Sequence, residues 1–284
     1  MRASRLFKRF SIGLVALWLL VFSFAPFLLV VIASFLKQGD ESFFSWSFNL
    51  GNYIQLATPI YWHVFLRSFY LAFETTLLCL LLGYPFAYIL SKFSMKVRTL
   101  LMAILIIPFW TSSLIRIYSL IILIRGQGLL NHALLSLGLI HQPLQILYSQ
   151  SAVLIGLVYC LLPFMILPLF ANLEKFDWRL VDAARDLSAS KLKILFKIVL
   201  PLSMPGVIAG VILVLLPAMT MFYVPDILGG ARSLLLGNLI KNQFIEAGNW
   251  PLGSAVSVAL TVLMSILLLI YWMGTQGRER RELM

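Results

Sequence analysis

Two ionisable side chains, Glu74 and Arg116, lie within long apolar segments of this 284-residue sequence. A charged side chain at the centre of a bilayer costs about 2.5–3.5 kcal/mol on insertion scales, so each is a candidate site. At 1.5 Å per helical residue, Glu74 lies roughly 9 Å and Arg116 roughly 12 Å from the outer end of its segment. This similar depth predicts an ion pair between them; the alternatives are a ligand contact for Glu74, or two side chains that reach the interface separately.

Catalytic and metal-binding chemistry has no comparable candidates in the sequence. The two cysteines, Cys79 and Cys160, lie in apolar runs, and the three histidines are scattered through connecting segments. The apolar segments hold no paired acids and no Ser/His/Asp set, and no G-x-x-x-x-G-K-[ST] loop for nucleotide phosphates occurs. The sequence therefore predicts neither an enzyme nor a protein with a metal or cofactor.

The elements that must position the charged residues are predicted membrane helices. The chain is 61% hydrophobic and 12% charged, with a mean hydropathy of +0.96, which excludes a soluble enzyme or a disulfide-stapled domain. We therefore expect an all-α, polytopic membrane protein with six transmembrane helices. The predicted spans are 11–36, 68–90, 100–124, 151–172, 198–224 and 252–276. The first is too long for a cleaved signal peptide and predicts an anchor.

Basic residues set the predicted orientation. Most of the 22 lie in the two tails and in the second and fourth connections, which share one side of the membrane. The positive-inside rule therefore places both termini in the cytoplasm. The net charge of +11 is explained by this topology, so nucleic acid is not an expected partner.

The most highly charged stretch is the predicted cytoplasmic connection 173–197. A helical period there places Leu180, Ala183, Ala184 and Leu187 on one face, and the two alanines allow another surface to approach closely. Asp182 and Arg185 flank that face with both signs of charge. Two interpretations are open: a helix that rests on anionic lipid, or a helix that docks on a partner protein.

The end of this connection leads into the fifth predicted span. Ser188 or Ser190 is expected to cap a helix over 191–199. Pro201 suits the first turn of the span, where no amide hydrogen is needed. Gly206 and Gly210 form a small-x-x-x-small pattern that suits close helix packing, either within the chain or with another subunit.

The residues from Asp182 to Pro201 resemble the EAA loop of ABC-importer permeases. Asp182 stands where that family usually has Glu, and Ser188 stands where it usually has Gly. A left-handed turn at Ser188 would be easier for Gly. The resemblance implies docking in a groove of a cytoplasmic ATPase by Leu180, Asp182, Ala183, Ala184, Arg185, Leu187 and Ser188.

Further segments are similar to spermidine/putrescine importer permeases, among them 108–116, 222–226 and 250–251. This resemblance implies the type I ABC importer permease fold in a bacterial cytoplasmic (inner) membrane. It also implies four kinds of partner besides lipid: an ABC ATPase dimer, a second homologous permease, an extracytoplasmic solute-binding protein and the polyamine itself. No cofactor is expected, because ATP hydrolysis belongs to the partner ATPase.

The polyamine expectation adds a chemical role for particular side chains. Polyamines are flexible organic polycations, which bind carboxylates and aromatic faces. Glu74, Trp110, Tyr223 and Asp226 are therefore candidates for the substrate path, with Arg116 as the ion-pair candidate. The alternatives are a solvated turn with interfacial aromatic residues for Tyr223 and Asp226, and simple packing for Trp110.

The predicted organisation has three parts. Residues 1–66 hold the N-terminal tail, the first span and the first outer loop, 67–274 form the permease domain, and 275–284 form a cytoplasmic tail. An importer for another solute, such as an organic amine, a phosphonate, iron or an inorganic anion, is the first alternative. An ion-coupled secondary transporter is the second, and the lack of a detectable repeat between the two halves weakens it.

Overall fold

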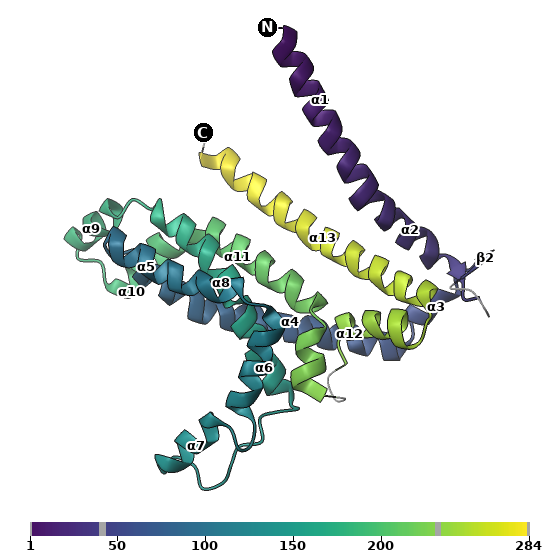
Figure 1. Ribbon diagram of the computed structural model, residues 1–284. Coiled ribbons are helices and arrows are strands. Elements are labelled where there is room, and N and C mark those ends of the chain that lie inside the picture. Colours follow the sequence, from purple (N-terminus) through teal and green to yellow (C-terminus); the bar gives the residue numbers. More distant parts are fainter. Residues whose placement is uncertain (1, 40–43, 231–233, 283–284) are drawn as a thin grey trace. The chain divides into compact units, whose positions relative to one another are not determined.

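The computed structural model describes residues 2–39, 44–230 and 234–282, and most of them belong to helices (Figure 1). Within this described part, the only sheet is an antiparallel pair of β1 (Leu36–Lys37) and β2 (Ser45–Phe48). The chain forms two compact units, each with its own internal packing: Met1–His63 with Leu239–Leu267, and Val64–Asn238 with Leu268–Met284. The expected all-α class is confirmed.

The helical elements follow one another with short connections. Up to the end of α7 they are α1 (Arg2–Leu19), η1 (Leu20–Phe24), α2 (Ala25–Ser34), α3 (Gly51–Leu56), α4 (Pro59–Leu90), α5 (Met95–Ile106), η2 (Ile107–Trp110), α6 (Ser113–Ile124) and α7 (Leu129–Ser136). After it come α8 (Gln150–Glu174), α9 (Arg179–Asp186), α10 (Lys191–Ile194), η3 (Leu195–Val199), α11 (Leu200–Thr220), η4 (Pro225–Gly229), α12 (Leu236–Lys241), η6 (Asn242–Glu246) and α13 (Trp250–Glu282).

Six helical segments of the described chain are long and apolar enough to cross a membrane, as predicted. They are Ser11–Ser34, Pro59–Leu90, Ser113–Ser136, Gln150–Glu174, Lys191–Thr220 and Trp250–Leu269. The second and fifth begin earlier than the sequence pattern indicated, and the third is displaced along the chain. The predicted boundaries at 66 and 274 and the cytoplasmic placement of the termini stay predictions.

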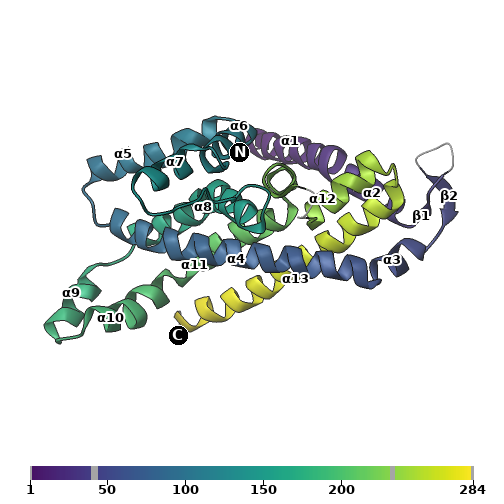
Figure 2. The same cartoon turned by 90° about the horizontal axis from the view of Figure 1, so that it is seen from below.

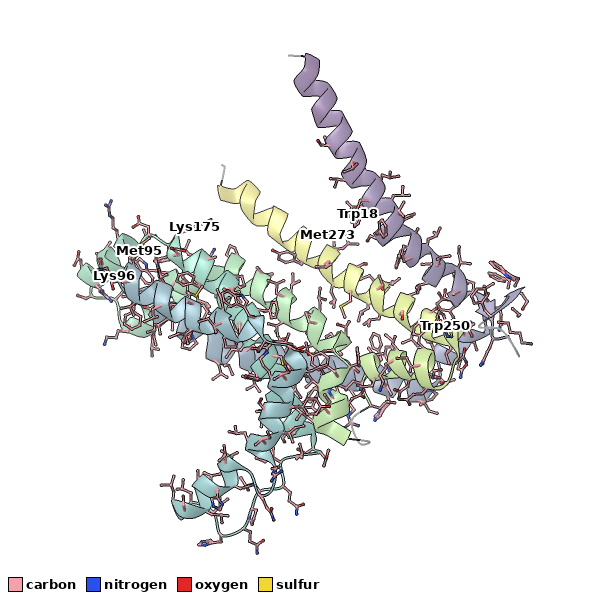
Figure 3. All side chains as sticks on the ribbon, viewed as in Figure 1. Trp18, Met95, Lys96, Lys175, Trp250 and Met273 are labelled. Carbon is pink, nitrogen blue, oxygen red and sulfur yellow. The ribbon has the colours of Figure 1, made fainter. Side chains whose placement is uncertain are left out.

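The first unit begins with the consecutive helical elements α1, η1 and α2. The π-turn η1 lies just before a proline in this run. Directly before Pro26, the amide of Ala25 bonds to the carbonyl of Leu20, five residues back. The wider turn makes room for the proline ring, which in a regular helix meets the carbonyl four residues earlier. Apolar side chains of this run point outward, as Trp18 does (Figure 3), and this exposure suits contact with lipid.

A buried amide ties α3 to the end of α2 within the same unit. The Asn52 side chain donates hydrogen bonds to the carbonyls of Ser34, at 3.0 Å, and Leu36, at 2.9 Å. The hydroxyls of Ser34 and Tyr53 lie 2.8 Å apart. The bond to the Ser34 carbonyl satisfies a backbone group that the end of α2 leaves without a partner in the helix.

Three helices, α4, α8 and α11, run side by side in the second unit (Figure 2). Gly83 of α4 lies against Met165 of α8, and a Cβ atom added at Gly83 would lie 3.2 Å from Met165 Cγ. The hydroxyls of Tyr84 on α4 and Ser203 on α11 lie 2.9 Å apart. Small residues and one polar contact thus hold the three helices close together.

The glycine pair of the fifth span packs inside the chain. An added Cβ atom at Gly206 would lie 2.7 Å from Asn172 Cβ, and one at Gly210 would lie 2.6 Å from Met165 Sδ. Both neighbours belong to α8, so the small-x-x-x-small pattern brings α11 against α8. Of the two possibilities that the sequence left open, contact within the chain is the one that the structure contains.

The predicted third span over 100–124 is wrong, because the chain breaks in its middle. Pro108 lies in the short 3₁₀ turn η2, and Thr111 and Ser112 are extended, with ψ angles of 148° and 135°. Figure 1 shows α5 and α6 running in different directions on the two sides of this break. Since proline lacks an amide hydrogen and its ring crowds the preceding turn, a straight helix through this point is disfavoured. The membrane-length segment begins at Ser113 instead.

The fifth span begins at Lys191 rather than near Pro201. Ser190 caps it by accepting a hydrogen bond from the amide of Lys193 at 3.4 Å, so the helix predicted over 191–199 is confirmed. Pro201 lies in the first turn of α11, as predicted, although α10 and η3 continue the helical segment before it. The π-turn η3 directly before it, closed by the Leu200 amide on the Leu195 carbonyl, accommodates the ring.

The turn before this helix is left-handed, although serine stands there where such a turn favours glycine. Ser188 has a φ angle of 58°. Its amide bonds to the Arg185 carbonyl at 2.8 Å, and the Ala189 amide bonds to the Ala184 carbonyl at 3.1 Å. These two bonds form a Schellman motif, which satisfies the last carbonyls of α9. Serine therefore adopts here a conformation that costs an L-residue roughly 1–2 kcal/mol.

Replacing Gly206 or Gly210 with valine is expected to lower the thermal midpoint of the purified protein. The new side chain meets α8, and overpacking of this kind costs about 1–3 kcal/mol. Thermal unfolding in detergent, followed by size-exclusion chromatography, measures the midpoint. Gly13→Val is the matched control, because nothing lies within 4 Å of a Cβ atom there. An equal loss in all three variants would contradict the internal packing role.

Replacing Ser188 with glycine is expected to raise the free energy of unfolding by up to about 1 kcal/mol, because glycine has no Cβ to clash at positive φ. The thermal midpoint is expected to rise accordingly. Ser188→Val is expected to lower it. The control is Ser190→Gly, at a φ angle of −66°, where no gain is expected. A fall in stability for Ser188→Gly argues against the left-handed turn.

Candidate functional site

The short helix α9 exposes an apolar face outside the predicted spans. Leu180 is 46% exposed and Leu187 is 84% exposed, and Ala183 lies between them on the same side. Ala184 is buried together with Val181, so its predicted place on the exposed face is wrong. Ala184 lies at the edge of the predicted apolar face. Val181, about one helical turn earlier, lies next to it on the helix surface and is buried, so this edge faces the interior.

Two charged side chains predicted to flank this face lie on the other side of the helix: at 3.6 residues per turn, Arg185 is roughly 140° and Asp182 roughly 160° from Leu180. Arg185 Nη1 lies 3.0 Å from Asp182 Oδ1, and both side chains are more than half exposed. An exposed pair within one helical turn contributes little to stability, because water screens it. Both charges thus remain at the surface, where a partner can contact them.

An aromatic cluster that the sequence analysis missed holds the start of α9. The Trp178 ring lies 5.6 Å from the Tyr88 ring and 4.9 Å from the Phe176 ring, measured between centroids. Lys92 Nζ donates a hydrogen bond to the Tyr88 hydroxyl at 2.7 Å and lies 5.3 Å from the Trp178 ring centroid. These ring and cation–π contacts tie α9 to the end of α4. Aromatic residues next to lysine at the end of an apolar span were the available signal.

A second contact joins two connections at the same end of this unit. Arg98 Nη2 forms an ion pair with Glu174 Oε1 at 2.8 Å, and its guanidinium lies 5.6 Å from the Phe170 ring. In Figure 3, Lys96 and Lys175 mark this end. The fold therefore brings together two of the basic connections that the positive-inside rule assigns to one side.

Within the described residues, no ion pair joins Glu74 to Arg116, so that prediction is wrong. The Arg116 guanidinium lies 4.8 Å from the Phe109 ring centroid, and its buried Nε has no hydrogen-bond partner. Tyr223 and Cys160 are its polar neighbours. Glu74 instead lies beside the Tyr70 hydroxyl. The depth of Arg116 was counted along a span over 100–124; because the membrane-length segment begins at Ser113 instead, the equal depth on which this prediction depended does not hold.

The remaining path candidates occupy different surroundings. Trp110 is 85% exposed at the end of η2, so it does not pack inside the chain. Asp226 is exposed and accepts a hydrogen bond from the Asn238 amide, which also donates to the Phe222 carbonyl at 2.9 Å. Tyr223 is half-buried, with Ser113 as a further neighbour. Of the membrane candidates, the structure brings Tyr223 and Arg116 together.

Comparison with known proteins places these features in a family. Residues 80–278 match the family of the binding-protein-dependent transport system inner membrane component. The chain is 52% identical over 259 residues to the spermidine/putrescine transport system permease protein PotB of Escherichia coli (strain K12), covering 91% of this chain and 94% of that protein. It is 46% identical over 275 residues to the protein of the same name from Haemophilus influenzae, with 97% and 96% covered.

A solved structure supports the same fold. A bacterial alginate ABC transporter, in complex with an alginate pentasaccharide-bound periplasmic protein, superimposes with a TM-score of 0.76 over 94% of this chain and 93% of that chain. Since the identity is 14%, this likeness concerns the fold alone. Taken with the family match over most of the membrane region, the chain belongs to the binding-protein-dependent transport system inner membrane component family.

Proposed function

We propose that this chain is a permease subunit of an ATP-driven importer for polyamines such as spermidine and putrescine. The observation that carries the proposal is the identity of about half of all aligned residues with polyamine permeases, over nearly the whole chain. The chain would form half of an alternating-access pathway, and a second permease would form the other half. A separate ATPase supplies the energy, and an extracytoplasmic binding protein delivers the substrate.

The exposed face of α9, formed by Leu180, Ala183 and Leu187, is the proposed docking site for the ATPase. Large apolar side chains exposed together on a highly charged connection are typical of a surface that a partner covers. Asp182 is the exposed charge proposed to contact the ATPase at the margin of this surface, and Arg185 forms an ion pair with it. The small side chain of Ala183 allows the partner's backbone to approach closely.

The contacts of α9 supply a mechanical route into the membrane domain. At its start, the cluster of Trp178, Tyr88 and Lys92 joins it to α4. At its end, the Ser188 turn leads directly into the helical segment that contains α11. A displacement of α9 by the ATPase would therefore move the ends of two helices of the packed core. Interfaces with discrete packing convert such local shifts into larger rearrangements.

For the substrate path, Glu74, Trp110, Tyr223 and Asp226 remain the proposed contacts. Carboxylates attract ammonium groups, and exposed aromatic faces bind them through cation–π contacts. The exposure of Trp110 and Asp226 leaves both accessible to a ligand or to the second permease. Arg116 is better placed to hold Tyr223 and Phe109 in position than to bind a polycation, which it repels.

Replacing Leu187 with glutamate is expected to weaken association with the ATPase by about tenfold or more, because docking would bury the new carboxylate. Co-purification of the ATPase with tagged permease measures this association. The matched control is Leu137→Glu, at a leucine that is 71% exposed in a connection predicted to lie outside. If both variants retained the ATPase equally, the docking role of α9 would be refuted.

Uptake of labelled spermidine by the complete transporter in proteoliposomes tests the substrate assignment. Excess unlabelled spermidine or putrescine is expected to abolish uptake. Uptake that neither compound reduces would refute the polyamine proposal. Asp226→Asn and Glu74→Gln are each expected to reduce uptake at unchanged membrane levels, because they remove a carboxylate that attracts the cation. The charge-retaining variants Asp226→Glu and Glu74→Asp serve as controls. Normal uptake in both amide variants removes these residues from the path.

A further inference from the structure

A cavity of about 440 Å³ lies between the end of α4, one side of α9 and the start of α10. Lys92, Arg185 and Lys191 line it, together with Tyr84 and Tyr88. None of the described residues that line it is acidic. Three cations that share one cavity repel each other, and this repulsion is relieved when an anion enters.

The three cations retain donors for such an anion. Lys92 Nζ donates one hydrogen bond to the Tyr88 hydroxyl, and Arg185 Nη1 donates one to the Asp182 carboxylate. An ammonium group has three donors and a guanidinium has five, so most remain available. Among the described residues, Lys191 forms no ion pair. Lysine and arginine side chains that line one cavity form the usual environment of a phosphate group, and the one described acid bonded to them, Asp182, lies outside the lining.

The position of the cavity along the spans indicates the level of the lipid headgroups. The apolar segment Pro59–Leu90 ends beside it, and the segment Lys191–Thr220 begins beside it. Tyr84 and Tyr88 lie in the last turns of the first of these segments, where aromatic side chains commonly mark the membrane interface. Basic residues concentrate on this side, which the positive-inside rule assigns to the cytoplasm.

The other walls of the cavity are apolar. Val181, Leu192, Ile194 and Leu195 contribute them, and Val181 and Ile194 are almost completely buried. A small hydrated anion gains nothing from such walls, whereas the glycerol and first methylene groups of a phospholipid lose contact with water there. The lining therefore suits a phosphate that carries hydrocarbon.

The proposed ATPase-docking face of α9 is a different face. At 3.6 residues per turn, the side of α9 that carries Val181 and Arg185 is turned by roughly 100–140° from Leu180. A partner that covers Leu180 and Leu187 therefore leaves the cavity side of α9 uncovered, and that side faces the membrane. We propose that this cavity binds the headgroup phosphate of an anionic phospholipid from the cytoplasmic leaflet, an inference that goes beyond transport and does not depend on the substrate.

The test uses the purified transporter complex in detergent, titrated with phosphatidylglycerol or phosphatidylcholine, with retained lipid counted by native mass spectrometry. We expect preferential retention of phosphatidylglycerol. Lys191→Gln is expected to weaken retention about tenfold, because a charge-assisted hydrogen bond is lost. Lys191→Arg is expected to restore it. Lys193→Gln is the matched control, because it removes the same charge from the same helix at a residue outside the cavity lining.

Three results would overturn the proposal. Equal loss in the Lys191→Gln and Lys193→Gln variants would mean that general surface charge, and not the cavity, holds the lipid. Displacement of lipid by millimolar inorganic phosphate, with retention of that phosphate, would identify a free anion as the ligand. Retention that depends on Lys191 only after removal of the ATPase would mean that a segment of the ATPase occupies the cavity in the complex.

Discussion

The constraint on which the structure depends is that backbone amide and carbonyl groups inside a bilayer must be hydrogen-bonded within the protein. Helices satisfy it, but proline removes a donor and crowds the turn before it. Pro26 and Pro201 each follow a π-turn, Pro225 begins one, and Pro108 lies in a 3₁₀ turn. Each local change of helix type keeps most backbone groups bonded while the helix changes direction or width. Of these four, Pro108 is the one at which the chain changes direction, between α5 and α6 (Figure 1).

The same constraint concentrates polar chemistry at the ends of the spans. At the end near α9, the contact between Lys92 and Trp178 attaches the charged connection to α4. The turn at Ser188 joins the same connection to the helical segment that contains α11. A helix held at both ends by two different core helices suits the transmission of force better than a freely mobile loop. The cavity beside it places a proposed lipid site next to the proposed ATPase-docking face, so lipid composition and coupling meet at one structural element.

Features that depend on periodicity or local chemistry were predictable. The number of spans and the helix over 191–199 were both expected, because each follows from residue types over one or two turns. The third span was wrong, since a proline in an apolar run is tolerated in some membrane helices and breaks others. Hydropathy alone does not distinguish the two outcomes, because it averages over the break.

The sequence by itself determined that the chain is a helical membrane protein with one highly charged connection, because composition and period suffice for both. Only the tertiary structure decided which side chains meet. Glu74 and Arg116 face different neighbours, Ala184 turns inward with Val181, and Lys92 stacks on aromatic rings from two segments. Such contacts depend on how each helix is rotated about its axis. That rotation is set by close packing, as at Gly206 and Gly210 against α8, and no local pattern encodes it.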